Sequence, residues 1–192
     1  MKLILASGSP RRKTILKKFN FKFRVIKPKI NEGLYIKKMK GKAPEFTASA
    51  LALKKAEKAA EKIKKGVILG SDTIVARAGK IMGKPRSKKD ARRILSALSG
   101  SVHCVITGIA LVDAETGKSA VSYDTTTIYF KKMSPSQIKN YINNNNVMDK
   151  AGSYAIQEGA DPFVKEYKGS YYNIVGLPVE KLKKLMKVFG EI

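Results

Sequence analysis

Segments that favour strands and segments that favour helices alternate through the first hundred residues, and this order limits the folds open to the chain. Residues 67–70 form an uninterrupted apolar run, VILG, which is typical of a strand buried on both faces. The pattern predicts strands at 2–6, 21–26 and 67–70, and helices at 10–19 and 45–65. Such alternation indicates an α/β architecture built on one sheet.

Local signals set the ends of these elements. Ser9 is a candidate N-cap followed by proline at the first helical position, and Gly66 closes the long amphipathic helix. The apolar strand ends at 71–73, with 74–76 as an extension of it. Residues 27–44, rich in Pro and Gly, predict a loop that carries a short helical turn.

The second half of the chain favours hairpins and short strands. Residues 102–112 and 119–130 alternate around a turn, as in a β-hairpin. Other predicted segments are a helix at 87–98, a helix from 134 to the asparagine run 143–146, Gly-rich short β segments over 147–177 and a terminal helix at 178–189. There is no internal repeat and no linker poor in apolar residues. Residues 1–192 are therefore expected to form a single domain with two lobes around a central cleft.

A net charge of +24 is the unusual property of the composition. Such a field attracts polyanions, whether nucleic acid, anionic lipid or nucleotide. Most of the excess is lysine, in pairs on the polar faces of predicted helices, which favours a solvated surface. A nucleic-acid groove needs basic residues interleaved with stacking aromatic rings, and that pattern is weak in the sequence. Nucleic acid is therefore not a required partner.

Apolar runs and cysteine content bear on location. The longest uncharged apolar runs have the length of strands, so no membrane contact is expected. Cys104 is the only cysteine and His103 the only histidine, which argues against a disulfide framework and against a zinc site. Both are expected to be buried, the histidine as a packed side chain and the cysteine as an inert one. These features favour the cytoplasm, and the oligomeric state stays open, a homodimer included.

The segment Ser7–Arg12 lies between a predicted strand and a predicted helix. A helix N-terminus offers unpaired N–H groups and the positive end of a dipole, which favour phosphate. Ser7 and Ser9 add hydroxyl donors, and the guanidinium groups of Arg11 and Arg12 can bind phosphate oxygens bidentately. The alternative is an ordinary capped helix with two surface arginines, because the glycine spacing of a P-loop is missing.

Three further positions carry candidate chemistry. Asp72 follows a buried strand, where open α/β sheets bind ligands, and it could hold a divalent ion or accept a proton from water. Lys84 lies in a Gly-Lys-Pro turn that could aim a charge at phosphate. The amide of Gln157 could bind the edge of a base. A capping aspartate, a turn lysine and a structural glutamine are the alternatives.

Together these segments resemble the Maf family of nucleoside-triphosphate pyrophosphatases. The motifs that carry the resemblance are LILASGSPRR (3–12), LAxxKA (51–56), GSDTIV (70–75), GKP (83–85), LSGSVHCVITG (98–108), DKAGSYAIQ (149–157) and GLP (176–178). Each is weak alone, but seven in the family's order are specific and span nearly the whole chain. The resemblance implies a central mixed, twisted sheet flanked by helices, with two lobes around a cleft.

The resemblance also implies metal-dependent hydrolysis of a nucleotide to a monophosphate and pyrophosphate. Asp72 would be the proton acceptor, and Glu32 would help it to hold Mg²⁺ or Mn²⁺. The triphosphate would be bound by Ser7, Ser9, Arg12, Lys55 and Lys84. The positions that follow substrate choice would be Arg11, Thr73 and Gln157. This set is similar to that of the branch acting on dTTP and UTP, whereas the branch acting on 7-methyl-GTP has Trp in place of Arg11.

The hypothesis is that water attacks the α-phosphorus and is deprotonated by Asp72 or activated by the metal, while Arg12, Lys55 and Lys84 offset the charge of the leaving pyrophosphate. Two alternatives stay open. One is the same chemistry on modified or non-canonical nucleotides. The other is a nucleic-acid-binding protein with a vestigial nucleotide site. The lysine excess is not required by the family and leaves a further polyanion contact open.

Overall fold

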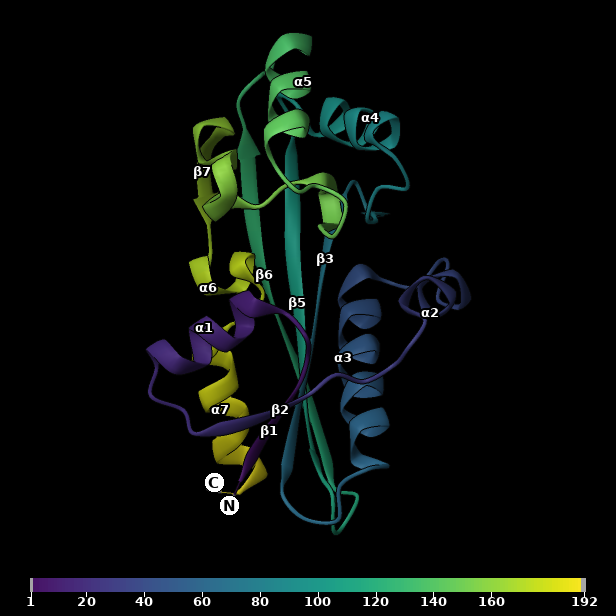
Figure 1. The fold of residues 1–192 in the computed structure, drawn as a ribbon, viewed down its shortest axis with the longest axis vertical. Helices are drawn as coiled ribbons and strands as arrows, with labels where there is room; N and C mark the ends of the chain where they lie inside the picture. Colours follow the sequence, from purple (N-terminus) through teal and green to yellow (C-terminus); the bar gives the residue numbers. More distant parts are fainter. Residues whose placement is uncertain (1, 191–192) are drawn as a thin grey trace.

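A computed structural model describes residues 2–190 and shows a mixed seven-stranded sheet flanked by helices (Figure 1), as predicted. The strand order is β2-β1-β3-β5-β6-β7, with β4 paired to β3. The strands are β1 (Leu3–Ala6), β2 (Phe23–Ile26), β3 (Val67–Arg77), β4 (Lys80–Met82), β5 (Val102–Asp113), β6 (Ser119–Phe130) and β7 (Val164–Lys168). β1 lies parallel to β2 and β3, and the other pairings are antiparallel.

Strand β3 continues past its apolar start, and the extension predicted at 74–76 is confirmed. The apolar start pairs with β1 only as far as Gly70, opposite Ala6, but pairing with β5 continues to Ala76 and the strand ends at Arg77. The antiparallel ladder with β5 therefore runs through the polar residues 71–73. Asp72 and Thr73 therefore lie within a strand, just past the point where β1 stops.

The helices cover both faces of the sheet. They are α1 (Pro10–Lys18), α2 (Glu32–Lys38), α3 (Pro44–Ala60), α4 (Lys88–Leu98), α5 (Pro135–Asn144), α6 (Tyr171–Val175) and α7 (Val179–Phe189). Alternate residues of a strand point to opposite faces. Leu3 and Leu5 pack with α1 and α7, whereas Ile4 and Ala6 pack with α3. In Figure 1, α3 accordingly lies on the other side of the sheet from α1 and α7.

Helix α3 packs unusually close to the sheet because two facing strand residues lack side chains. A Cβ added to Gly70 would lie 2.0 Å from the Ala52 carbonyl oxygen, and one added to Gly108 would lie 2.3 Å from that of Ala48. Only glycine permits this approach. The helix ends at Ala60 rather than at the predicted 65, and i to i+3 bonds close its last turn. Because α3 lies this close to the sheet, the packing determines which groups on β3 a side chain of α3 can reach.

Separate apolar clusters occupy the two ends of the long strands. One joins α4, α5 and the far ends of β3, β5 and β6, and the others lie under α1, α7 and α3. Figure 1 shows α4 and α5 together at one end of the sheet, away from α1 and α7. This division agrees with two lobes, and the single domain over 1–192 stays a prediction. No helix within residues 2–190 combines the length and apolarity needed to cross a membrane.

Of two irregular regions, one follows the prediction and one does not. The short helical turn predicted within 27–44 is confirmed as α2, whose N-cap Asn31 accepts a bond from the backbone of Leu34. Over 147–177 the expected short β segments are wrong except for β7. The chain forms short helical turns at Ala151–Ser153, Ile156–Ala160 and Asp161–Phe163, followed by α6. Gly152 and Gly159 have positive φ angles there, which interrupts extended structure.

Candidate functional site

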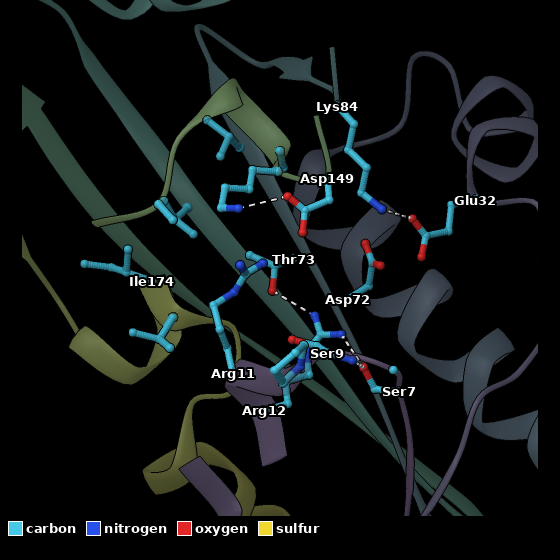
Figure 2. A pocket seen from close by; sticks show the side chains of 18 of the residues that line it. Ser7, Ser9, Arg11, Arg12, Glu32, Asp72, Thr73, Lys84, Asp149 and Ile174 are labelled. Carbon is cyan, nitrogen blue, oxygen red and sulfur yellow. Dashed lines mark hydrogen bonds and ion pairs between the residues drawn. The ribbon is translucent and has the colours of Figure 1, made fainter. Parts of the chain in front are cut away.

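A cleft of about 480 Å³ lies where β1 ends, between α1, α2 and the turns that follow α5. All ten residues predicted from the sequence line it. They are Ser7, Ser9, Arg11, Arg12, Glu32, Lys55, Asp72, Thr73, Lys84 and Gln157. Figure 2 shows Glu32 and Lys84 at one side of the cleft and Ile174 at the other, with Asp72 and Arg12 between them. Six separate stretches of sequence thus contribute to one site.

The segment between β1 and α1 is organised by Ser7 rather than by Ser9. The Ser7 hydroxyl oxygen accepts bonds from the Ser9 backbone N–H at 3.2 Å and from Arg12 at 3.0 Å. Ser9 occupies the predicted N-cap position, although its side chain makes no capping bond. Pro10 follows it at the start of the helix, as predicted.

Arg12 is almost buried, with 8% of its surface exposed. Its guanidinium donates to the Gly176 carbonyl at 2.8 Å, to Ser7 at 3.0 Å and to Thr73 Oγ1 at 3.1 Å. Burial lowers its pKa, and the charge of Asp72 opposes that shift. Arg12 therefore joins α1, β3 and the turn before α7 at the floor of the cleft.

Asp72, Lys55, Glu32 and Lys84 form a continuous ion network, called here the strand network because its centre lies on β3 and α3. Lys55 Nζ binds Asp72 Oδ1, and it lies 2.7 Å from Glu32 Oε1. Lys84 Nζ lies 2.7 Å from the other oxygen of Glu32. The side chains of Lys55 and Asp72 are 8% and 9% exposed. Two acids and two lysines from β3, α2, α3 and the turn after β4 thus meet at one place.

The charge state of Glu32 follows from these neighbours. Its partial burial would raise the pKa, but the charges and hydrogen bonds of Lys55 and Lys84 outweigh burial and lower the pKa to about 2. Glu32 is therefore ionised at neutral pH. Within residues 2–190, no group of three or more His, Cys, Asp and Glu side chains could hold a metal by itself.

A second network, called here the turn network, is made of Arg11, Glu158, Lys150 and Asp149, of which all but Glu158 line the cleft. Arg11 lies 3.0 Å from Glu158 Oε1, and Lys150 Nζ lies 2.8 Å from Glu158 Oε2 and 2.9 Å from Asp149 Oδ1. Lys150 is buried. From the sequence, Asp149 and Lys150 were noted only as part of a motif, and Glu158 was not predicted. The signal available was a cluster of charges inside a Gly-rich, otherwise apolar segment.

Thr73 is hydrogen-bonded to a network of hydroxyl and amide groups. Thr73 Oγ1 lies 2.9 Å from Thr107 Oγ1, which donates to the Asn173 backbone carbonyl. The side chain of Asn173 bonds to the backbone of Thr107 and Val105 and to Thr126 Oγ1. These buried residues were not predicted from the sequence, because only the fold brings β5, β6 and α6 together.

The remaining wall is apolar. Side chains of Val75, Val105, Tyr154, Ile156 and Ile174 line it. Gln157 lies beside this wall on the turn Ile156–Ala160 and is exposed. A flat apolar surface with an amide and a guanidinium at its edge can hold the ring of a nucleobase.

His103 takes no part in the cleft. It is buried and its Nε2 lies 2.8 Å from the Tyr154 hydroxyl. Burial and, to a lesser extent, the charge of Arg77 lower its pKa to about 4, so it is neutral at pH 7. The prediction of a packed histidine is confirmed. Cys104 was expected to be buried but is only partly so, because the outer side of β5 is incompletely covered there.

Comparison with known proteins agrees with this geometry. The sequence profile of the family described as Maf-like protein matches residues 2–189. The dTTP/UTP pyrophosphatase of Alkaliphilus metalliredigens is 45% identical over 96% of this chain and 94% of its own. That of Carboxydothermus hydrogenoformans is 40% identical over 99% of this chain and 100% of its own.

Among solved structures, the Ham1 protein of Staphylococcus aureus aligns with a TM-score of 0.53 at 12% identity, over 98% of this chain and 100% of that one. This likeness concerns the fold alone. The family match extends over nearly the whole sequence and includes every segment that lines the cleft. The chain therefore belongs to the Maf family.

Proposed function

We propose that the chain is a nucleoside-triphosphate pyrophosphatase that hydrolyses dTTP and UTP to the monophosphate and pyrophosphate. The observation that carries this proposal is the strand network, in which a buried carboxylate, Asp72, pairs with Lys55 and is linked through Glu32 to Lys84. The names of the relatives supply the reaction class and the substrates. We further propose that residues 1–192 act as one domain in the cytoplasm, with the oligomeric state open to a homodimer.

The triphosphate would lie along the strand network. Ser7 and Ser9 are at the N-terminus of α1, where backbone N–H groups and the helix dipole favour anions. Lys55 and Lys84 approach from the opposite side. Arg12 would add its remaining N–H groups, because three of its donors are already committed to the protein. The base would then lie on the apolar wall, near Arg11, Thr73 and Gln157.

A divalent cation fits the two carboxylates of the strand network. One ammonium, that of Lys55, reaches an oxygen of Asp72 and an oxygen of Glu32, so the two acids converge on one point as ligands of a single cation must. Mg²⁺ prefers oxygen ligands and is usually bound by one or two carboxylates together with substrate phosphates. Asp72 and Glu32 would hold Mg²⁺ or Mn²⁺, which when bound would neutralise phosphate charge and polarise the phosphoryl group.

In this proposal Asp72 accepts the proton of the attacking water. A water directed at the α-phosphorus would transfer its proton to the carboxylate as the bond to phosphorus forms and the bond to the pyrophosphate oxygen breaks. Lys55 and Lys84 would stabilise the negative charge that collects on the leaving pyrophosphate. The protein forms no covalent bond in this scheme, so its contribution is positioning and electrostatics.

Pyrophosphate release from a panel of nucleoside triphosphates, with and without Mg²⁺, tests the proposal. Metal-dependent release with dTTP and UTP preferred is the expected result. Preference for modified nucleotides would keep the reaction and change the substrate. No release with any nucleotide, together with salt-sensitive binding of DNA or RNA, would overturn the proposal in favour of a nucleic-acid-binding protein.

A further inference from the structure

Glu158 connects two parts of the cleft wall that are far apart in sequence. Its carboxylate binds Arg11, 147 residues earlier, at the start of α1. It also belongs to the turn Ile156–Ala160, which carries Gln157. One side chain thus ties together the two segments that, under the proposed function, recognise the base.

Both oxygens of this carboxylate are occupied. Oε1 binds Arg11 and Oε2 binds Lys150 at 2.8 Å. Lys150 is itself fixed, since its side chain is 3% exposed and its ammonium also donates to the Asn146 carbonyl at 2.5 Å and to Asp149. Partial burial would raise the pKa of Glu158, but bonds to Lys150 and Arg11 lower it, so the group is a charged anchor at neutral pH.

The backbone of the same turn is fixed from α5. The Tyr141 hydroxyl donates to the Glu158 carbonyl at 3.2 Å and accepts from the Ala155 N–H at 3.2 Å. Tyr141 is 4% exposed, so its ring is held in the core. Gln157 lies between these two bonds. The backbone of Ile156–Ala160 therefore holds Glu158 in place, and the carboxylate of Glu158 holds Arg11.

The orientation of Arg11 matters because a guanidinium can only donate hydrogen bonds. The ion pair occupies one terminal nitrogen, NH1, and leaves the other N–H groups for a ligand in the cleft. Uracil and thymine carry an acceptor carbonyl at position 4, whereas cytosine carries a donor amino group there. A fixed Arg11 would bind the first kind of base and would oppose the second.

We propose that Glu158 is a positioning residue for base selection, which holds Arg11 so that the cleft accepts a pyrimidine with a 4-carbonyl group and rejects one with a 4-amino group. The inference rests on the proposed function, in which Arg11 meets the base. It adds Glu158 to the residues proposed for base recognition. It also states that the contact with Arg11 distinguishes uracil and thymine from cytosine.

The test compares kcat/KM for UTP and CTP in the wild type and in Glu158→Gln. The amide keeps the shape but replaces one of the two acceptor oxygens with an NH2 donor, so Arg11 and Lys150 cannot both keep their present bonds. We expect the UTP:CTP ratio of kcat/KM to fall about tenfold, mostly through a higher KM for UTP, with the unfolding temperature close to the wild-type value. Glu158→Asp, which keeps the charge, should recover part of the ratio.

Two further variants separate positioning from a general effect. Arg11→Ala should lower the ratio as well, and adding Glu158→Gln to it should lower the ratio no further, because the two residues act through one contact. Glu166→Gln removes a carboxylate from β7, outside the cleft lining, and should leave the ratio unchanged. An unchanged ratio in a folded Glu158→Gln variant, or independent effects in the double variant, would overturn the inference.

Binding of the monophosphates separates this inference from the proposed function. Calorimetric titration with UMP and CMP measures the effect of the same contact on binding affinity, without hydrolysis. If the wild type releases no pyrophosphate from any nucleotide, the proposed function fails, yet a preference for UMP that Glu158→Gln removes would still support base selection by Glu158. If the wild type turns over UTP and binds UMP and CMP equally, the inference alone fails.

Discussion

The strand network and the turn network border the same cleft, but they are built differently. The strand network is centred on a long strand and a helix that packs on glycines, and its central pair, Lys55 and Asp72, is nearly buried. The turn network lies on short helical turns, and its two carboxylates, Asp149 and Glu158, are 57% and 38% exposed. Rigid elements thus hold the groups proposed for chemistry, whereas the groups proposed for selectivity lie on an irregular segment, which can change without disturbing the sheet.

The largest expected effect separates the two networks by activity. Asp72→Asn should lower turnover of dTTP and UTP by about 100- to 1000-fold, since an amide cannot accept the proton from water. The protein should stay folded because the amide oxygen can still accept a bond from Lys55. Pyrophosphate release and circular dichroism give the two readouts.

The matched variant is Asp149→Asn in the turn network, whose exposed carboxylate pairs with Lys150. Its turnover should stay within a few-fold of the wild-type rate, on the order of 1 kcal/mol in the barrier. Near-normal activity in Asp72→Asn, or an equal loss in both variants, would contradict the assignment of chemistry to the strand network.

The next effect separates the networks by stability. Lys55→Met should lower the free energy of unfolding by about 3–5 kcal/mol, because it leaves the buried carboxylate of Asp72 without its partner. Lys150→Met should cost less, since Asp149 and Glu158 can turn to water. Urea unfolding of both variants measures the difference. If both variants lost the same free energy of unfolding, the exposure of the acids would not determine how much each network contributes to stability.

The residues themselves explain how far the sequence could predict these regions. Asp72 and Lys84 were identified from their local sequence, whereas Lys55 and Glu32 were identified only through the resemblance to the Maf family. Their mutual pairing was not predicted, because it depends on the close approach of α3 to β3 at Gly70 and Gly108. The apolar periodicity predicted most helices and strands, but the length of β3 depends on its partner β5.

The turn network was harder to predict because no periodicity describes its segment. Glycines with positive φ break residues 147–177 into turns that neither a helical nor a strand pattern can indicate. Glu158 gains its role only through Arg11, and nothing local to either residue indicates that pairing. Thr107 and Asn173 are similar cases, since their bonds join three elements that are distant in sequence.

A smaller effect tests the packing that positions the strand network. Gly70→Ala places a methyl group against the backbone carbonyl of Ala52, so α3 must move or the core must strain. We expect a loss of about 1–3 kcal/mol in the free energy of unfolding, accompanied by lower turnover as Lys55 shifts away from Asp72. Gly83→Ala is the control, because nothing lies within 4 Å of its added methyl group. If Gly70→Ala were as stable and active as Gly83→Ala, the close approach of α3 would not position Lys55.

The smallest expected effect concerns how the free energy of unfolding changes at acidic pH. Because Lys55 and Lys84 lower the pKa of Glu32 from its ordinary value of 4.5 to about 2, the folded state binds fewer protons at this group than the unfolded state does. Its stabilising contribution is therefore complete above pH 4.5 and is lost as the pH falls toward 2. Glu32→Gln should lower the free energy of unfolding at neutral pH and should lose less stability over that interval than the wild type does. Urea unfolding at a series of pH values measures both slopes. Parallel slopes would show that the ion pairs of Glu32 do not contribute to acid stability, and that the outer part of the strand network is as solvated as the turn network.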